Sequence, residues 1–289
     1  MSFFVDENTR LIVQGITGRE GSFHAEQMLE YKTNVVAGVT PGKGGTTVLG
    51  LPVYNTVREA KEKHDANASV LFVPPRFLYD AAYEAIMTGI SLVVTIAEHT
   101  PVHDMLKLHH LAKDKGVQLI GPNSFGVISP GKAKAGFMAH RIFAQGNVGI
   151  MSRSATNCYE TAFLMMKESI GQSTVVGVGG DMIPGSTFVD VLPHFEADPQ
   201  TKVIVMIGEI GGSEEELAAA YIKDHVTKPV IALIAGTNAP KDVSMGHAGA
   251  IVSPDGEGSA EKKMEQLLAA GALIAESTED IVRILKTLV

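Results

Sequence analysis

Short apolar, β-branched segments alternate with segments of helical spacing along the chain, and this alternation most constrains the fold. In the first half the expected strands are residues 11–14, 34–39, 69–73, 91–96 and 117–120, and expected helices include 76–88 and 103–115. In the second half the expected strands are 147–151, 173–178, 202–207 and 229–234, and the expected helices are 157–169, 187–197, 214–225 and 259–270. The pattern predicts an α/β protein with parallel sheets covered by helices on both faces.

Helix starts and one interruption divide this pattern further. Capping boxes are expected at Thr56 with Glu59, at Ser213 with Glu216 and at Ser277 with Asp280. Residues 121–146 are rich in Gly and Pro and weakly periodic, so we expect a linker with a surface excursion there. A length of 289 residues suits two domains, and we predict them at 1–122 and 123–289.

Composition excludes several classes of protein. One cysteine cannot form an internal disulfide. With a net charge of −8, the chain lacks the excess of basic residues that is typical of nucleic-acid-binding proteins. The sequence has no apolar run near the ~20 residues that span a bilayer. Acidic Asp6 and Glu7, with no basic region before an apolar stretch, argue against a signal or transit peptide. We therefore expect a cytoplasmic protein that binds neither membrane nor nucleic acid.

A glycine-rich loop follows the first expected strand. Gly15, Gly18 and Gly21 lie where strand turns into helix, and backbone N–H groups at such a turn suit a pyrophosphate. The spacing matches the dinucleotide fingerprint only loosely. The next strand ends without the acidic residue of NAD sites and has Lys43 instead. A cation there suits the extra phosphate of NADP or coenzyme A, and the alternative is a structural turn with a solvated lysine.

Glycine clusters also follow the expected strands of the second half. Residues 152–156, 179–181 and 208–212 would lie at the carboxyl edge of a parallel sheet, where ligands bind in such folds. His247 stands between small residues in segment 245–250 and could carry a phosphoryl group, with Glu209 holding its other ring nitrogen. The alternative is a loop histidine without a role. Cys158 is expected to be a small packing residue.

The chain resembles a known family, the alpha subunits of succinyl-CoA synthetases (succinate–CoA ligases). The resemblance runs from end to end and is carried by long motifs in the same order. These motifs are VQGITGREGSFH, GVTPGKGGTTVLGLPVYNTVREA, IGPNSFGVISPG, VGIMSRSATNCYE, GVGGDMIPGSTF, VIVMIGEIGG and MGHAGAIV.

The resemblance implies a fold, a reaction and a partner. A Rossmann-like domain would bind coenzyme A, and a flavodoxin-like domain would carry a phosphohistidine. A separate beta subunit would supply an ATP-grasp site for ATP or GTP with magnesium, and part of the acid site. The reaction would be acid + CoA + NTP giving acyl-CoA + NDP + phosphate, reversibly, through an acyl phosphate, as in the tricarboxylic acid cycle. No metal is expected in this chain.

The resemblance also implies roles for individual residues. His247 would be phosphorylated, and Glu209 would orient it. The CoA contacts would be Thr17, Gly18, Arg19, Glu20, Lys43, Ile96, Ala97 and Glu98. The positions around phosphate and acid would be Asn123, Ser154, Ala155 and Tyr159.

The sequence departs from the family pattern at three places, and these departures leave two alternatives. Residues 123–126 read NSFG where the family usually has NCPG, and Ala155 and Asn157 depart from the family's SRSGTL. Residues 242–244 replace a Gly and two basic residues, a pair that the related ATP-citrate lyase and citryl-CoA synthetase also lack. One alternative is the same chemistry on another acid, such as malate or citrate. The other is a CoA- or NADP-binding module without catalysis.

Overall fold

The computed structural model describes residues 4–240 and 242–289. They form two compact units. The first comprises Met138 and everything described before it, together with Ile183–Gly185. The second comprises Ala139–Met182 and Ser186–Val289. Each unit is an α/β structure built on a largely parallel sheet, which confirms the predicted fold class.

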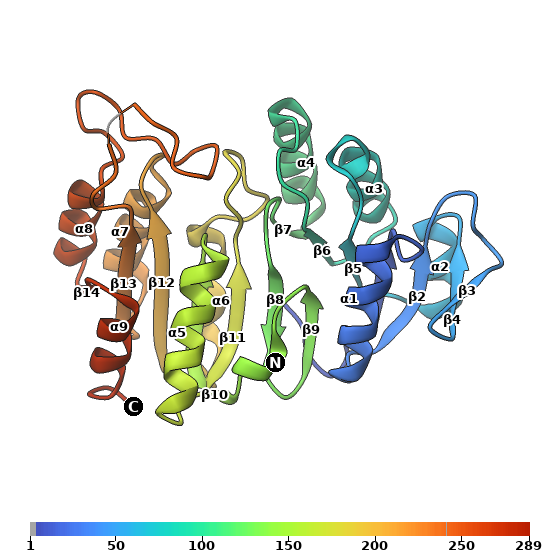
Figure 1. Cartoon of the computed structure of the whole chain (residues 1–289), viewed down its shortest axis with the longest axis horizontal. Helices are drawn as coiled ribbons and strands as arrows, with labels where there is room; N and C mark the ends of the chain where they lie inside the picture. Colours follow the sequence, from blue (N-terminus) through green and yellow to red (C-terminus); the bar gives the residue numbers. More distant parts are fainter. Residues whose placement is uncertain (1–3, 241) are drawn as a thin grey trace. The chain divides into compact units, whose positions relative to one another are not determined.

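The first unit is built on a seven-stranded sheet with the order β3-β4-β2-β1-β5-β6-β7 (Figure 1). Its strands are β1 (Leu11–Gln14), β2 (Val35–Val39), β3 (Thr47–Val48), β4 (Leu51–Tyr54), β5 (Ala68–Leu71), β6 (Leu92–Thr95) and β7 (Gln118–Ile120). Its helices are α1 (Arg19–Glu30), α2 (Val57–His64), α3 (Pro75–Met87) and α4 (Val102–Lys115). Strand order reverses between β1 and β5, the Rossmann-like switch point beside which ligands bind.

The segment expected to be an exposed linker contains a buried hairpin instead. Strands β8 (Gly126–Ser129) and β9 (Ala133–Gly136) pair antiparallel, and all eight of their residues are buried. Gly126 permits the close approach, because a Cβ there would lie 2.2 Å from the carbonyl oxygen of Ala135. Small residues hide the alternation typical of a strand, so the linker prediction at 121–146 was wrong.

The position of the hairpin affects where the chain divides. The contacts place β8 and β9 in the first unit, so the compact units separate between Met138 and Ala139. The sequence predicted the functional domains as 1–122 and 123–289. That division stays a prediction.

The second unit is built on the parallel strands β14-β13-β12-β10-β11 (Figure 1). Their bounds are β10 (Gln145–Ser152), β11 (Gln172–Gly177), β12 (Val203–Glu209), β13 (Val230–Ala235) and β14 (Leu273–Ala275). The helices are α5 (Ala155–Lys167), α6 (Phe188–Ala197), α7 (Glu214–His225), α8 (Ala260–Ala269) and α9 (Thr278–Leu285). Ser152 pairs with Gly177 and Ile207, so the carboxyl ends of the three central strands meet at one edge.

The helix starts agree only in part with the predicted capping boxes. Thr56 and Ser277 accept hydrogen bonds from the third residue of their helices, at 3.1 and 3.2 Å. Ser213 precedes α7 but its side chain caps nothing, so that prediction was wrong. The reciprocal capping box recorded for α6 is formed by Thr187 and Asp190 and was not predicted.

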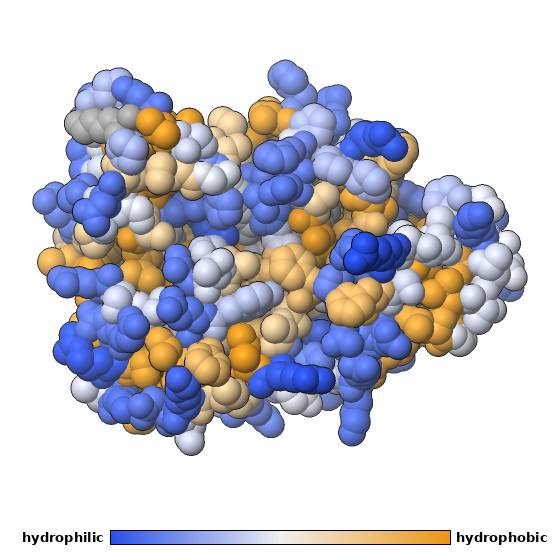
Figure 2. Space-filling view, viewed as in Figure 1, coloured by the Kyte–Doolittle hydropathy of each residue, from blue (hydrophilic) through white to orange (hydrophobic). Residues whose placement is uncertain are grey.

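Apolar side chains also occur on the surface of both units. Across residues 4–240 and 242–289, no helix is long and apolar enough to cross a membrane. Figure 2 shows hydrophilic residues interspersed with apolar ones on one face of the molecule. Large exposed apolar side chains include Phe23 and Phe77 in the first unit, and Met182 and Met245 in the second. Met182 and Met245 belong to segments that carry the site described next.

Candidate functional site

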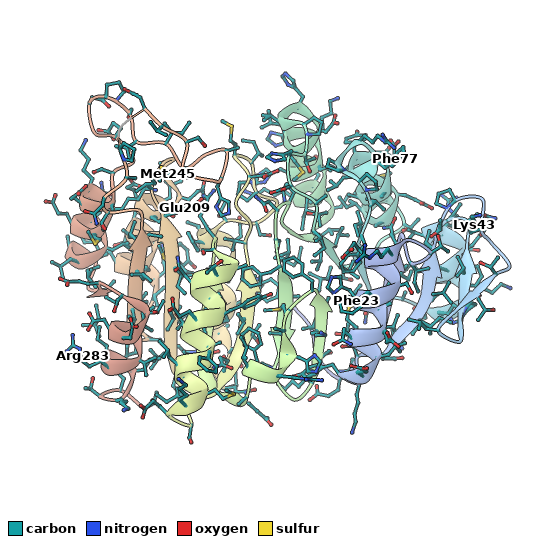
Figure 3. The ribbon with its side chains drawn as sticks, viewed as in Figure 1. Phe23, Lys43, Phe77, Glu209, Met245 and Arg283 are labelled. Atoms are coloured by element: carbon teal, nitrogen blue, oxygen red, sulfur yellow. The ribbon has the colours of Figure 1, made fainter. Side chains whose placement is uncertain are left out.

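His247 lies in the segment that connects β13 to α8, and a tight turn holds it. The N–H of Ala250 donates to the carbonyl of His247 at 3.1 Å, and the hydroxyl of Ser244 donates to the same oxygen at 3.0 Å. The N–H of Met245 donates back to the carbonyl of Ala250 at 3.0 Å. Figure 3 shows Met245 and Glu209 in the same region of the molecule. The turn therefore fixes the backbone around His247.

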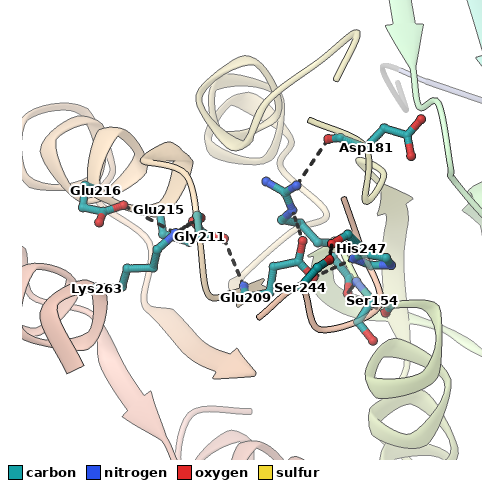
Figure 4. A network of polar contacts seen from close by, with 11 residues as sticks. Ser154, Asp181, Glu209, Gly211, Glu215, Glu216, Ser244, His247 and Lys263 are labelled. Atoms are coloured by element: carbon teal, nitrogen blue, oxygen red, sulfur yellow. Dashed lines mark hydrogen bonds and ion pairs between the residues drawn. The ribbon is translucent and has the colours of Figure 1, made fainter. Parts of the chain in front are cut away.

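Glu209, the last residue of β12, holds the imidazole. Its Oε2 lies 2.6 Å from Nδ1 of His247 (Figure 4). A carboxylate only accepts, so Nδ1 carries the proton and the lone pair is left on Nε2. The hydrogen bond to Glu209 raises the pKa of His247 above its usual value, and burial opposes the rise. The His247 side chain is 28% exposed, so a reactant can reach it.

Arg153 holds the other oxygen of the Glu209 carboxylate. Its Nε lies 2.8 Å from Oε1, and the two side chains are only 7% and 9% exposed. Arg153 also donates to the carbonyl of Asp181 at 3.4 Å. Arg153 was not predicted as a site residue, although it directly follows the buried end of β10. The carboxylate is therefore held between a guanidinium and an imidazole, which fixes its orientation.

Gly180 makes room for the imidazole. A Cβ at this position would lie 2.5 Å from both Cε1 and Nδ1 of His247. The backbone of Gly180 is not in the left-handed region, so the requirement for glycine is one of space alone. The glycine cluster predicted after β11 therefore forms one wall of the histidine site.

Three of the residues predicted around phosphate and acid lie in or beside α5. Ser154 caps the helix by accepting from the N–H of Asn157 at 3.2 Å, and Ala155 is its first residue. The first-turn N–H groups of a helix have no intrahelical acceptor, so this end suits an anion. Ser154 is drawn with His247 in the polar network of Figure 4. Tyr159 is half-buried and packs edge-to-face on Phe143.

The environment of α5 also settles the character of Cys158. Its side chain is fully buried, and burial raises the pKa of the thiol far above its usual value. A buried thiol held in the neutral form is a poor nucleophile. The prediction that Cys158 is a packing residue is confirmed.

A pocket of about 620 Å³ in the first unit contains two of the predicted CoA contacts, Thr17 and Gly18. It opens where β1, β2 and β5 end. Its lining comprises Gln14, Gly15, Thr17, Gly18, Val39, Thr40, Pro41, Phe72, Val73, Pro74, Phe77, Asp80, Ala81 and Glu84. The loop after β5 and the start of α3 were missed, although residues 69–73 were expected to form a strand. The positive end of α1 and the apolar walls suit a phosphorylated ligand with a flat, apolar part.

The other predicted first-unit residues lie outside that lining. Arg19 and Glu20 begin α1 and are exposed, and Lys43 lies in the exposed loop after β2. Residues 96–98 follow β6, where the carbonyl of Ala97 accepts from the N–H of Asn123 at 2.8 Å. Asn123 therefore belongs to the first unit, whereas the other residues predicted around phosphate and acid belong to the second. No group of three or more His, Cys, Asp or Glu residues within 4–240 and 242–289 could hold a metal ion.

Two protein families match separate parts of the chain. The CoA binding domain family matches residues 6–99, and the CoA-ligase family matches residues 151–273. The first match contains the loop at 15–21, and the second contains Arg153, Gly180, Glu209 and His247. Residues 6–99 lie in the first unit, and residues 151–273 lie in the second except for 183–185.

Individual relatives match along nearly the whole length. A succinate–CoA ligase [ADP-forming] subunit alpha 2 of Archaeoglobus fulgidus is 53% identical over 97% of both chains. An alpha subunit of the same description from Aquifex aeolicus is 52% identical over 100% of this chain and 96% of its own. ATP citrate lyase of Methanothrix soehngenii, solved with citrate and coenzyme A, is 27% identical with a TM-score of 0.89 over 98% of this chain.

The solved structure and the curated relatives differ in how much of them this chain covers. It spans about half of the ATP citrate lyase chain, 50%, but almost all of each alpha subunit. The sequence identity to the alpha subunits is also about twice the identity to ATP citrate lyase. The chain therefore belongs to the family of succinate–CoA ligase alpha subunits.

Proposed function

We propose that this chain works with a beta subunit as a succinate–CoA ligase. The reaction is succinate + CoA + ATP or GTP giving succinyl-CoA + nucleoside diphosphate + phosphate, and it is reversible. The 2.6 Å contact between Nδ1 of His247 and Glu209 carries the proposal. It leaves Nε2 with a lone pair, which is what a phosphoryl carrier needs.

The first transfer uses the side chains at the carboxyl edge of the second unit. Nε2 of His247 attacks the γ-phosphorus, and an N–P bond forms as the bond to the nucleoside diphosphate oxygen breaks. Nδ1 keeps its proton, and the Glu209 carboxylate stabilises the positive charge of the ring. Arg153 keeps that carboxylate in place. The N–H groups at the start of α5, after Ser154, supply donors for the phosphoryl oxygens.

The second transfer passes the phosphoryl group from His247 to the acid. A succinate carboxylate oxygen attacks phosphorus, the N–P bond breaks and succinyl phosphate forms. The CoA thiolate then attacks the acyl carbon, and phosphate leaves with the electron pair of the C–O bond. In this scheme Ala155 and Tyr159 contact acid or phosphate.

CoA binding is assigned to the first unit. The pocket at Thr17 and Gly18 takes part of the ligand, and the exposed residues Arg19, Glu20, Lys43 and 96–98 provide further contacts. A beta subunit of the ATP-grasp type holds the nucleotide with its magnesium. A cytoplasmic location fits this chemistry.

The choice of acid is the sharpest test of this function. Phe125, one basis for considering another acid, is only 2% exposed and packs in the interior. With the purified two-subunit enzyme, CoA-dependent ADP release should show kcat/KM for succinate at least ten times that for malate or citrate. A higher value for malate or citrate would replace succinate by that acid. CoA or NADP binding by calorimetry without any turnover would favour the non-catalytic module.

A further inference from the structure

A fully buried ion pair lies behind the histidine site. Lys263 on α8 and Glu215 on α7 are both 0% exposed, and Nζ of Lys263 contacts Oε2 of Glu215. The same Nζ donates to the carbonyl of Gly211 at 2.6 Å and lies 3.6 Å from Oε2 of Glu216 (Figure 4). The buried ammonium thus donates to one carbonyl and one carboxylate, and a second carboxylate lies nearby.

Glu215 connects this ion pair to Glu209. Its second oxygen, Oε1, accepts the backbone N–H of Glu209 at 3.0 Å. Gly208 makes this approach possible, because a Cβ there would lie 2.6 Å from the same oxygen. The residue that holds the His247 imidazole is therefore itself held at its backbone by Glu215.

Gly211 connects the ion pair to the turn that carries His247. A Cβ on Gly211 would lie 2.0 Å from the carbonyl oxygen of Gly249 and 2.6 Å from the N of Ile251. Its N–H donates to the carbonyl of Gly258 at 2.7 Å, on the far side of the same segment. Lys263, bonded to the Gly211 carbonyl, thus fixes the loop after β12 against which the histidine turn packs.

Stability alone does not explain such a pair. Removing two charges from water is costly, and a protein with well-packed apolar residues of similar volume in their place is often as stable or more so. We propose that Lys263 and Glu215 are positioning residues, which hold Glu209 and the His247 turn in register for phosphoryl transfer. The inference rests on the proposed role of His247 as the phosphoryl carrier.

The first test measures the rate of His247 phosphorylation from [γ-32P]ATP in the two-subunit enzyme. Lys263→Met keeps an unbranched, flexible side chain but removes the ammonium group, and Glu215→Gln removes the other charge. Each should slow labelling about 100-fold, the loss expected from a displacement of about 1 Å. Because the two residues act as one unit, the double variant should be no slower than the slower single variant.

Lys134→Met is the matched control. Lys134 is also a buried lysine, 1% exposed, but it lies in the first unit. Its replacement should leave the labelling rate within twofold of the wild type. Equal slowing by Lys134→Met and Lys263→Met would reduce the effect to loss of a buried lysine and overturn the inference.

The second test follows the protonation of His247 by NMR in the full-length chain, without nucleotide. The charged groups that face His247 are Glu209 from β12, Arg153 from the end of β10 and Asp181 from the loop after β11. A loosened Glu209 contact in Lys263→Met should lower the pKa of His247 towards its usual value, whereas Lys134→Met should not change it.

The outcomes separate the inference from the function. An unlabelled wild-type enzyme would contradict the proposed function, and the NMR titration would still test the link to Lys263. A folded Lys263→Met enzyme with unchanged labelling and an unchanged titration would overturn the inference. If Lys263→Met does not fold, Glu215→Gln, which keeps an acceptor for the Glu209 N–H, carries both tests.

Discussion

Replacing Gly180 by Ala should displace the histidine without removing any chemical group. The added Cβ would lie 2.5 Å from ring atoms of His247, and an ordinary contact begins at about 3.4 Å. The imidazole must therefore move by about 0.9 Å, and the 2.6 Å bond to Glu209 would be stretched or lost. A misplacement near 1 Å costs on the order of 100-fold in rate, so we expect phosphorylation of His247 to slow by about that factor.

The assay is single-turnover labelling of the two-subunit enzyme with [γ-32P]ATP. Gly249→Ala is the matched control, because a Cβ at Gly249 meets nothing closer than 3.7 Å and its backbone is not left-handed. The control should label within threefold of wild type, and both variants should melt cooperatively. Labelling of a folded Gly180→Ala enzyme at the wild-type rate would refute the packing argument.

Two further predictions concern the stability of the chain. Thr187→Ala removes a capping box and should lower the free energy of unfolding by about 1 kcal/mol in urea melts. Ser213→Ala should change it by less than about 0.5 kcal/mol, because the Ser213 side chain makes no cap, and equal losses in the two variants would contradict the observed caps. Burial lowers the pKa of Lys134 from 10.5 to about 8. The unfolded chain therefore binds this proton more tightly than the folded chain does. The free energy of unfolding of the wild type should consequently increase as the pH rises from 8 towards 10.5. Lys134→Met should lack this gain when urea melts at pH 7 and pH 10 are compared, and an unchanged pH dependence would contradict it.

The alternation of strands and helices was readable from the sequence because both sheets are mainly parallel and buried on both faces. Such strands are continuous apolar runs, as at β12, where all seven residues are buried. The hairpin at β8 and β9 was missed for the opposite reason. Its strands contain Gly126, Ala133 and Gly136, and the fully buried Lys134 breaks the apolar pattern.

The candidate site was predictable where strand ends and loops mark it, and not where distant side chains meet. His247 and Glu209 follow from small residues around a histidine and from an acid at a strand end. Arg153 and Lys263 owe their positions to packing between elements far apart in sequence. A signal for Lys263 existed, because it shares the buried face of α8 with Ala260 and Leu267, where a lysine is out of place.

The covalent state of His247 during turnover tests the central claim most directly. The two-subunit enzyme is incubated with ATP and magnesium, stopped in alkali and analysed by peptide mass spectrometry. We predict one phosphoryl group on His247, lost on addition of succinate and CoA, and absent together with turnover in His247→Ala. Labelling at another residue, or turnover that survives His247→Ala, would contradict the account.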